Sequence, residues 1–155
     1  MWKGTKTRRG LAAFMLTTAV VLGGCDDDPI TGGDEEPDVG GFAMTSGSTE
    51  LYRYTDEDAA QPDTLFLTSG QTYEVEVEWL DPNGDPIELG EEFELRVQAL
   101  HPGIASFTVT GAATGTIVAA SVSSPVSTAM QVTLWHTVEE HPDFDSVFFP
   151  VKVSP

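Results

Sequence analysis

Histidine and carboxylate side chains gather near the C-terminal end of this 155-residue sequence. His136 and His141 flank a short acidic stretch that contains Glu139, and Asp143 follows two residues after the second histidine. Neutral imidazole nitrogens and carboxylate oxygens are donors that Zn²⁺ and Cu²⁺ accept in proteins. The sequence therefore predicts a transition-metal site made by His136, His141 and Asp143, with His101 and Glu139 as further candidate ligands.

A purely structural interpretation of the same residues stays open. His136 continues the alternating apolar row of Met130, Val132 and Leu134, so it can close a core-facing row without binding a ligand. The pair His141–Pro142 can serve only as a turn. The spacing is no established ligand signature, and whether the third histidine lies nearby depends on strand pairing.

Two clusters of oxygen donors offer a second kind of metal site. Asp81–Asp85 (DPNGD) and Asp56–Asp58 (DED) could hold Ca²⁺ at one end of the domain, because Ca²⁺ prefers carboxylate and carbonyl oxygens. The first cluster differs from an EF-hand loop, since its glycine stands at position four and not at position six. A plain hairpin turn accounts for it equally well.

The sequence contains no local signature of an enzyme. The segment Gly111–Gly115 lacks the lysine and the following helix of a phosphate-binding loop. No nucleophile elbow is present either. We therefore predict a non-enzymatic protein without catalytic residues or an organic cofactor, with a small secreted hydrolase as a third alternative.

The first 24 residues have the organisation of an export signal. A leader with four basic residues and no acidic ones precedes the apolar run Leu11–Leu22, which is too short to span a bilayer stably. The run ends in Leu22-Gly23-Gly24-Cys25, and Cys25 is the only cysteine of the chain. A disulfide within the chain is therefore excluded.

The string Leu22-Gly23-Gly24-Cys25 resembles the lipobox of bacterial lipoproteins. The resemblance implies that residues 1–24 are removed as a signal peptide and that the Cys25 thiol carries a lipid. It also implies a location in the bacterial cell envelope, on the inner or outer membrane, facing the periplasm or the cell exterior. Two or three acyl chains anchor a protein firmly, since each buried CH₂ contributes about 0.8 kcal/mol.

Charge is distributed unevenly along the chain. Beyond the leader, only Arg53, Arg96 and Lys152 stand against all 25 acidic residues. Such a chain repels phosphate backbones, so we predict no nucleic-acid partner. Residues 25–41 comprise the lipidated cysteine and a segment with seven acids, four glycines and two prolines, which predicts a disordered linker.

From Phe42 to Pro155 the pattern is that of half-buried strands. Tyr73–Trp79 and Phe93–Ala99 alternate apolar and polar residues with period two. Turn residues separate further strand-like runs, which are Thr49–Tyr54, Thr64–Thr68, Ile104–Thr110, Gly115–Val122, Met130–Val138 and Ser146–Val153. Residues 42–155 are therefore expected to form one all-β domain, an immunoglobulin-like antiparallel sandwich of seven to nine strands. Pro150 predicts that the last strand lies at an edge or carries a bulge.

The stretch from Thr64 to Val122 resembles the bacterial immunoglobulin-like domains of adhesins and cell-surface proteins. The resemblance rests on four segments, which are Leu65–Thr72, Val77–Gly84, Ile104–Phe107 and Gly115–Ala119. It implies a spacer or binding module, because those domains share no catalytic site. Our first hypothesis is a lipid-anchored envelope protein acting as a non-enzymatic binding or accessory module, whose partner is another envelope protein or a glycan. The alternative is an envelope lipoprotein that binds Zn²⁺ or Cu²⁺ at the histidine-rich hairpin.

Overall fold

The computed structural model describes residues 37–155. By its internal contacts the chain separates into two units, Met1–Asp34 and Glu35–Pro155. The predicted signal peptide, the predicted lipidation site Cys25 and most of the predicted linker lie outside the described residues.

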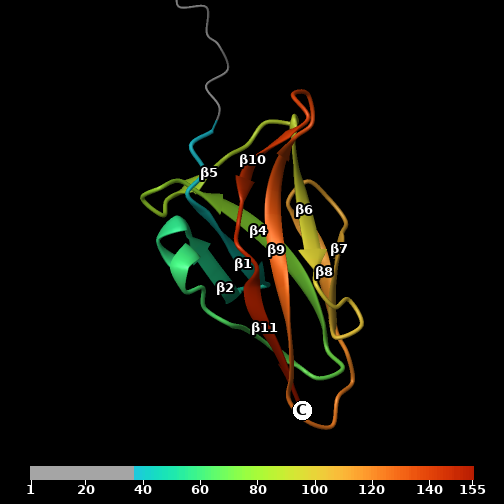
Figure 1. Ribbon diagram of the computed structural model, residues 1–155. Helices are drawn as coiled ribbons and strands as arrows, with labels where there is room; N and C mark the ends of the chain where they lie inside the picture. Colours follow the sequence, from blue (N-terminus) through green and yellow to red (C-terminus); the bar gives the residue numbers. More distant parts are fainter. Residues whose placement is uncertain (1–36) are drawn as a thin grey trace, which may run out of the picture. The chain divides into compact units, whose positions relative to one another are not determined.

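Residues 37–155 form an all-β domain with one short 3-10 helix (Figure 1). In chain order its elements are β1 (Gly41–Ser46), β2 (Thr49–Thr55), η1 (Asp56–Ala60), β3 (Leu65–Thr68), β4 (Thr72–Leu80), β5 (Pro86–Ile87), β6 (Phe93–Ala99), β7 (Ala105–Val109), β8 (Thr114–Ala119), β9 (Val126–His136), β10 (His141–Asp145) and β11 (Phe149–Ser154).

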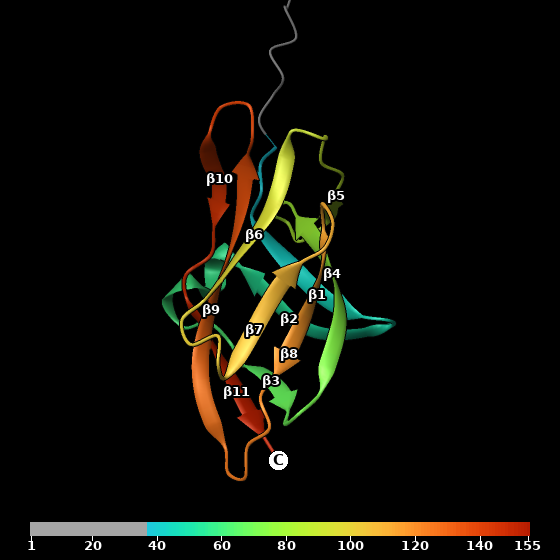
Figure 2. The same cartoon turned by 90° about the vertical axis from the view of Figure 1, so that its right-hand side faces the viewer.

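The strands form two sheets that pack face to face (Figures 1 and 2). One sheet has the order β2-β1-β4-β8-β7, with β5 pairing with β4. The other has the order β10-β9-β11-β3, with β6 on the opposite side of β9. All pairs are antiparallel except β11 and β3, which run parallel. The expected all-antiparallel arrangement is therefore wrong in this one pair, and the second sheet is mixed.

Eleven strands are present in the described part of the chain, against the seven to nine expected. The additional strands are β1, β5 and β10. Strand β5 has only two residues, so no alternation can reveal it. Strand β10 contains a proline and a register shift between Pro142 and Phe144, both of which interrupt the two-residue period.

An aromatic cluster fills the space between the sheets. The Phe42 ring lies within 5.6 to 6.3 Å, between centroids, of five other rings, which are Tyr52, Tyr54, Trp79, Phe144 and Phe149. Apolar rows from β4, β9 and β11 complete the core. Each fully buried side chain of this size contributes about 1.5 to 3 kcal/mol. Because Phe144 belongs to this cluster, the core holds β10 in place.

The packed domain begins before its predicted boundary at Phe42. Val39 is buried in the core, and the backbone N–H of Gly40 donates to the carbonyl of Leu80 at 2.9 Å. A Cβ on Gly41 would lie 2.2 Å from the Tyr54 carbonyl oxygen. The two glycines therefore allow close backbone approach at the start of β1.

Pro150 lies within a strand that has partners on both sides. It stands opposite Ala129 of β9, whose carbonyl already accepts a hydrogen bond from the Leu100 N–H. On the other side, pairing with β3 begins one residue later, at Val151 and Leu65. Pro150 therefore lies where β3 has not yet begun, so its missing N–H removes no hydrogen bond between β11 and β3. The expected edge position or bulge is not needed.

Candidate metal centre

The predicted ligands His136 and His141 lie directly opposite each other at the closed end of the β9–β10 hairpin. Four residues, Thr137 to Glu140, form the loop, and the Glu140 N–H donates to the His136 carbonyl at 2.9 Å. Glu140 adopts a φ of +59°, a left-handed conformation that costs free energy in a residue with a side chain. The turn therefore stores local strain between the two residues Glu139 and His141.

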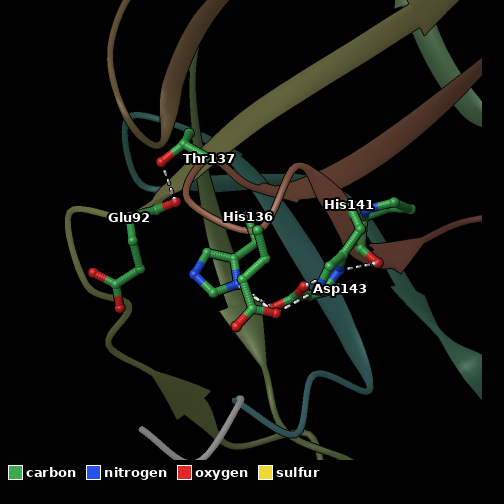
Figure 3. A network of polar contacts seen from close by, with 7 residues as sticks. Glu92, His136, Thr137, His141 and Asp143 are labelled. Atoms are coloured by element: carbon green, nitrogen blue, oxygen red, sulfur yellow. Dashed lines mark hydrogen bonds and ion pairs between the residues drawn. The ribbon is translucent and has the colours of Figure 1, made fainter.

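A β-bulge places Asp143 beside the two histidines. Register along β10 advances normally to Pro142, opposite Trp135, and resumes at Phe144, opposite Leu134, so that Asp143 is the extra residue. Bulges of this kind redirect a side chain out of the regular alternation. The Asp143 side chain is only 3% exposed. Figure 3 shows its carboxylate and the two imidazoles directed toward one another.

The hairpin loop is fixed to the start of β6 by hydrogen bonds from Thr137 and by a ring contact of His136. The Thr137 N–H and hydroxyl both donate to the Glu92 carbonyl, at 2.8 and 2.7 Å (Figure 3). The His136 ring stacks on Phe93, the first residue of β6, with centroids 4.8 Å apart. No sequence motif identifies Thr137, Glu92 or Phe93 as part of the site. The one available signal is the start of the alternating run at Phe93, which allows β6 to pair with the end of β9.

Four donor groups meet at this end of the hairpin. His136, Glu139 and His141 each offer a ligand atom, and these three atoms lie within 4.8 Å of one another. Nδ1 of His136 lies 3.8 Å from Oε2 of Glu139, and Nε2 of His141 lies 2.8 Å from the same oxygen. Asp143 approaches both rings, with Oδ2 at 3.9 Å from His136 Nδ1 and Oδ1 at 2.9 Å from His141 Nδ1.

The burial of these groups is uneven, and two of them lack hydrogen bonds. His136 Nδ1 and both carboxylate oxygens of Asp143 are buried without a hydrogen-bond partner among residues 37–155. The 2.9 Å approach of His141 Nδ1 to Asp143 is thus an ion-pair contact without hydrogen-bond alignment. A buried carboxylate without hydrogen bonds costs free energy, because it has lost its hydrogen bonds to water and no N–H or O–H group replaces them.

Glu139 and His141 form a hydrogen-bonded pair at the exposed side. The hydrogen bond from His141 lowers the pKa of Glu139, and the nearby imidazoles add to that effect. The same hydrogen bond raises the pKa of His141, with further contributions from the Pro142 carbonyl and Asp143. The contact therefore favours the protonated form of His141 and the ionised form of Glu139.

His101 does not belong to this group. Its backbone N–H donates to the Thr128 hydroxyl at 3.1 Å, and Thr128 lies eight residues before His136 on β9. At the usual rise of a strand, this separation is roughly 27 Å. The structure thus brings together His136, Glu139, His141 and Asp143 and leaves out the fifth candidate, because the β6–β7 loop lies at the opposite end of β9.

In each of the two candidate calcium loops, a carboxylate accepts hydrogen bonds within its own turn. Oδ1 of Asp81 accepts the N–H groups of Asn83 and Asp85 at 2.8 and 2.9 Å, and these bonds lower the pKa of Asp81. In η1, Oδ2 of Asp58 accepts the Thr55 N–H and hydroxyl. Both carboxylates therefore have the structural role that a plain turn predicts.

Comparisons with known proteins found similarity to solved structures but no matching family or curated protein. No protein-family model matches the sequence, and no curated protein matches it. Among solved structures, the chain is similar to one described as the crystal structure of the S-layer protein SbsC domains 4 and 5. The identity is 16% and the TM-score 0.39, over 61% of this chain and 49% of that one. The chain thus spans about half the length of that structure.

Within residues 37–155, no helix is long and apolar enough to cross a bilayer.

Proposed function

We propose that this domain is a non-enzymatic module that binds a transition-metal ion, Zn²⁺ or Cu²⁺, at the end of the β9–β10 hairpin. The observation that carries the proposal is the Asp143 carboxylate, which is buried beside two imidazoles and accepts no hydrogen bond within the described domain. A bound dication would coordinate this carboxylate directly and so replace the hydrogen bonds that it lacks.

The distances between the donors fit a small metal ion. In a tetrahedral site with bonds of about 2.0 to 2.2 Å, neighbouring donor atoms lie about 3.3 to 3.6 Å apart. Oε2 of Glu139 lies 3.8 Å from Nδ1 of His136 and 2.8 Å from Nε2 of His141, and these two separations bracket that value. Oδ2 of Asp143 lies 3.9 Å from the same His136 nitrogen. Small side-chain rotations would therefore suffice to close the site around an ion.

The donor types favour a borderline metal. Two imidazoles and two carboxylates, without a thiolate, suit Zn²⁺ and Cu²⁺, whereas Ca²⁺ and Mg²⁺ prefer sites made of oxygen ligands alone. If His141 binds through Nε2, its Nδ1 faces Asp143 at 2.9 Å. Asp143 would then orient the ring in the manner of a carboxylate behind a ligating histidine.

Isothermal titration of the full-length protein, purified in detergent without an affinity tag, tests this proposal. Zn²⁺ and Cu²⁺ should bind with one ion per chain, and His136→Ala should weaken binding at least about tenfold. His101→Ala is the matched control and should leave affinity unchanged, because this residue lies at the other end of β9. Binding no stronger than a micromolar background, or equal losses in both variants, would refute the site.

The cellular setting is part of the same proposal. The lipobox-like string ending in Cys25 supports a lipid-anchored protein of the bacterial envelope, with this domain outside the cytoplasm. Two packed sheets of short strands support an immunoglobulin-like relationship. Replacing Cys25 by Ser should block processing and move the protein out of the membrane fraction. An unchanged distribution would exclude the lipid anchor without affecting the metal proposal.

A further inference from the structure

We infer that the metal at this hairpin is exchangeable cargo, loaded and released at the exposed side, and not a structural ion. The inference rests on the metal-binding function proposed above and concerns how that same site is used.

The four donors divide into a fixed inner pair and an exposed outer pair. The side chains of Asp143 and His136 are 3% and 12% exposed, and both lie on the paired strands. The side chains of His141 and Glu139 are 41% and 52% exposed. Glu139 stands in the four-residue loop, outside either strand. A ligand from outside can therefore reach the metal from the Glu139 side without opening the core.

The hairpin keeps its conformation through contacts that involve no metal. Thr137 is held on the Glu92 carbonyl by two hydrogen bonds, and Phe144 anchors β10 among the core aromatic rings. Structural zinc sites are closed on all sides and supply folding free energy directly. This hairpin has its own anchors and one accessible side, which is the arrangement expected of a site that gives up its ion.

The exposed position of Glu139 defines the order in which the ligands would leave the metal, and its contact with His141 defines where Glu139 lies after the metal is released. An incoming donor would bind the metal at its open side, and the bond from the metal to Glu139 would break first, followed by the bond to His141. The acceptor gains the metal–ligand bonds that the protein loses, and the oxidation state of the metal does not change. After release, Nε2 of His141 and Oε2 of Glu139 lie in hydrogen-bond contact at 2.8 Å, as they do in the structure.

Stopped-flow transfer of Zn²⁺ to a chromophoric chelator tests this inference. The full-length protein in detergent is loaded with Zn²⁺ and mixed with increasing concentrations of 4-(2-pyridylazo)resorcinol. We expect the release rate to rise with chelator concentration, because attack at the open side precedes departure. Far-ultraviolet circular dichroism should remain unchanged after the metal is removed.

Two substitutions in the loop sharpen the test. Glu139→Gln should speed release by about tenfold or more, since it weakens the outer ligand. Glu140→Gln, the adjacent residue, should have the rate of the unmodified protein. Release that is independent of chelator concentration, or loss of β structure on metal removal, would identify a structural ion and overturn the inference while leaving metal binding intact. Failure to load Zn²⁺ at all would instead refute the proposed function.

Discussion

Nδ1 of His136 lies 3.9 Å from Oδ2 of Asp143, and neither atom has a hydrogen-bond partner in the domain that the structure describes. An imidazole and a carboxylate at this separation are too far apart to satisfy each other directly and close enough to share a third group. The hairpin therefore holds two buried polar groups in an arrangement that is unfavourable by itself. Such local cost is typical of sites whose favourable state includes a ligand.

The first prediction concerns the free energy of unfolding of the metal-free protein. Asp143→Asn should stabilise it by about 1 kcal/mol at about pH 9, because the change removes a buried charge that has no hydrogen bond. The same variant should lose metal affinity. Urea unfolding with and without Zn²⁺ measures both effects. Lower stability of the metal-free variant would mean that His141 already compensates the carboxylate fully.

The second prediction concerns pH. Because the pKa of His141 is raised above 6.5, its pair with Glu139 stabilises the folded protein below that value, and the contribution disappears as pH rises through the folded pKa. Because the pKa of Glu139 is lowered below 4.5, its contribution is present above 4.5 and disappears as pH falls through its folded pKa. The pair thus contributes fully between these two reference values.

Nuclear magnetic resonance titration of the metal-free protein measures the midpoint of His141 directly. Glu139→Gln should lower that midpoint toward 6.5, since the largest cause of the shift is the hydrogen bond to Glu139. Glu140→Gln should leave it in place. A midpoint unaffected by Glu139→Gln would show that the observed contact does not persist in solution.

The third prediction tests the anchor of β10. Phe144→Ala should reduce the free energy of unfolding by about 3 to 5 kcal/mol, because the ring is buried against Phe42, Tyr54 and Trp79. Val138→Ala removes an apolar side chain that is 76% exposed at the tip of the same hairpin. It should change stability by less than about 0.5 kcal/mol. Similar values for the two variants would be inconsistent with β10 packing on the core.

The fourth prediction concerns the strained turn. Glu140→Gly should raise stability by up to about 1 kcal/mol, because glycine adopts a positive φ without steric cost. Gly84→Ala is the reverse change at another position of positive φ and should lower stability by about 1 kcal/mol. Thermal unfolding followed by circular dichroism compares the two. A less stable Glu140→Gly variant would argue that the turn relaxes in solution.

Alternation predicted the strands that have one face in the core and one in solvent. In β4, Glu74, Glu76 and Glu78 are exposed while the residues between them are buried, so the period is visible in the sequence. Strand β10 could not be predicted this way, because Pro142 and the bulge at Asp143 break the period. The parallel pairing of β3 with β11 is a long-range relationship that no local pattern contains.

The candidate site was predictable only where the chain itself brings residues together. His136, Glu139, His141 and Asp143 meet because one hairpin contains all four, and hairpin closure is a local event. His101 lies apart from them, because β6 pairs with β9 so that Phe93 is opposite His136, and the chain leaves β6 at the other end. No local pattern contains this pairing. The uneven burial of the four donors depends on the bulge and on the contact of Thr137 with Glu92, neither of which the sequence reveals.

A crystal structure of the Zn²⁺-loaded protein, with anomalous diffraction recorded at the zinc edge, tests the central claim most directly. The account predicts one anomalous peak at the β9–β10 hairpin, within about 2.0 to 2.2 Å of donor atoms of His136, His141 and at least one of the two carboxylates. No peak at that hairpin, or a peak only at His101 or at the Asp81–Asp85 turn, would contradict it.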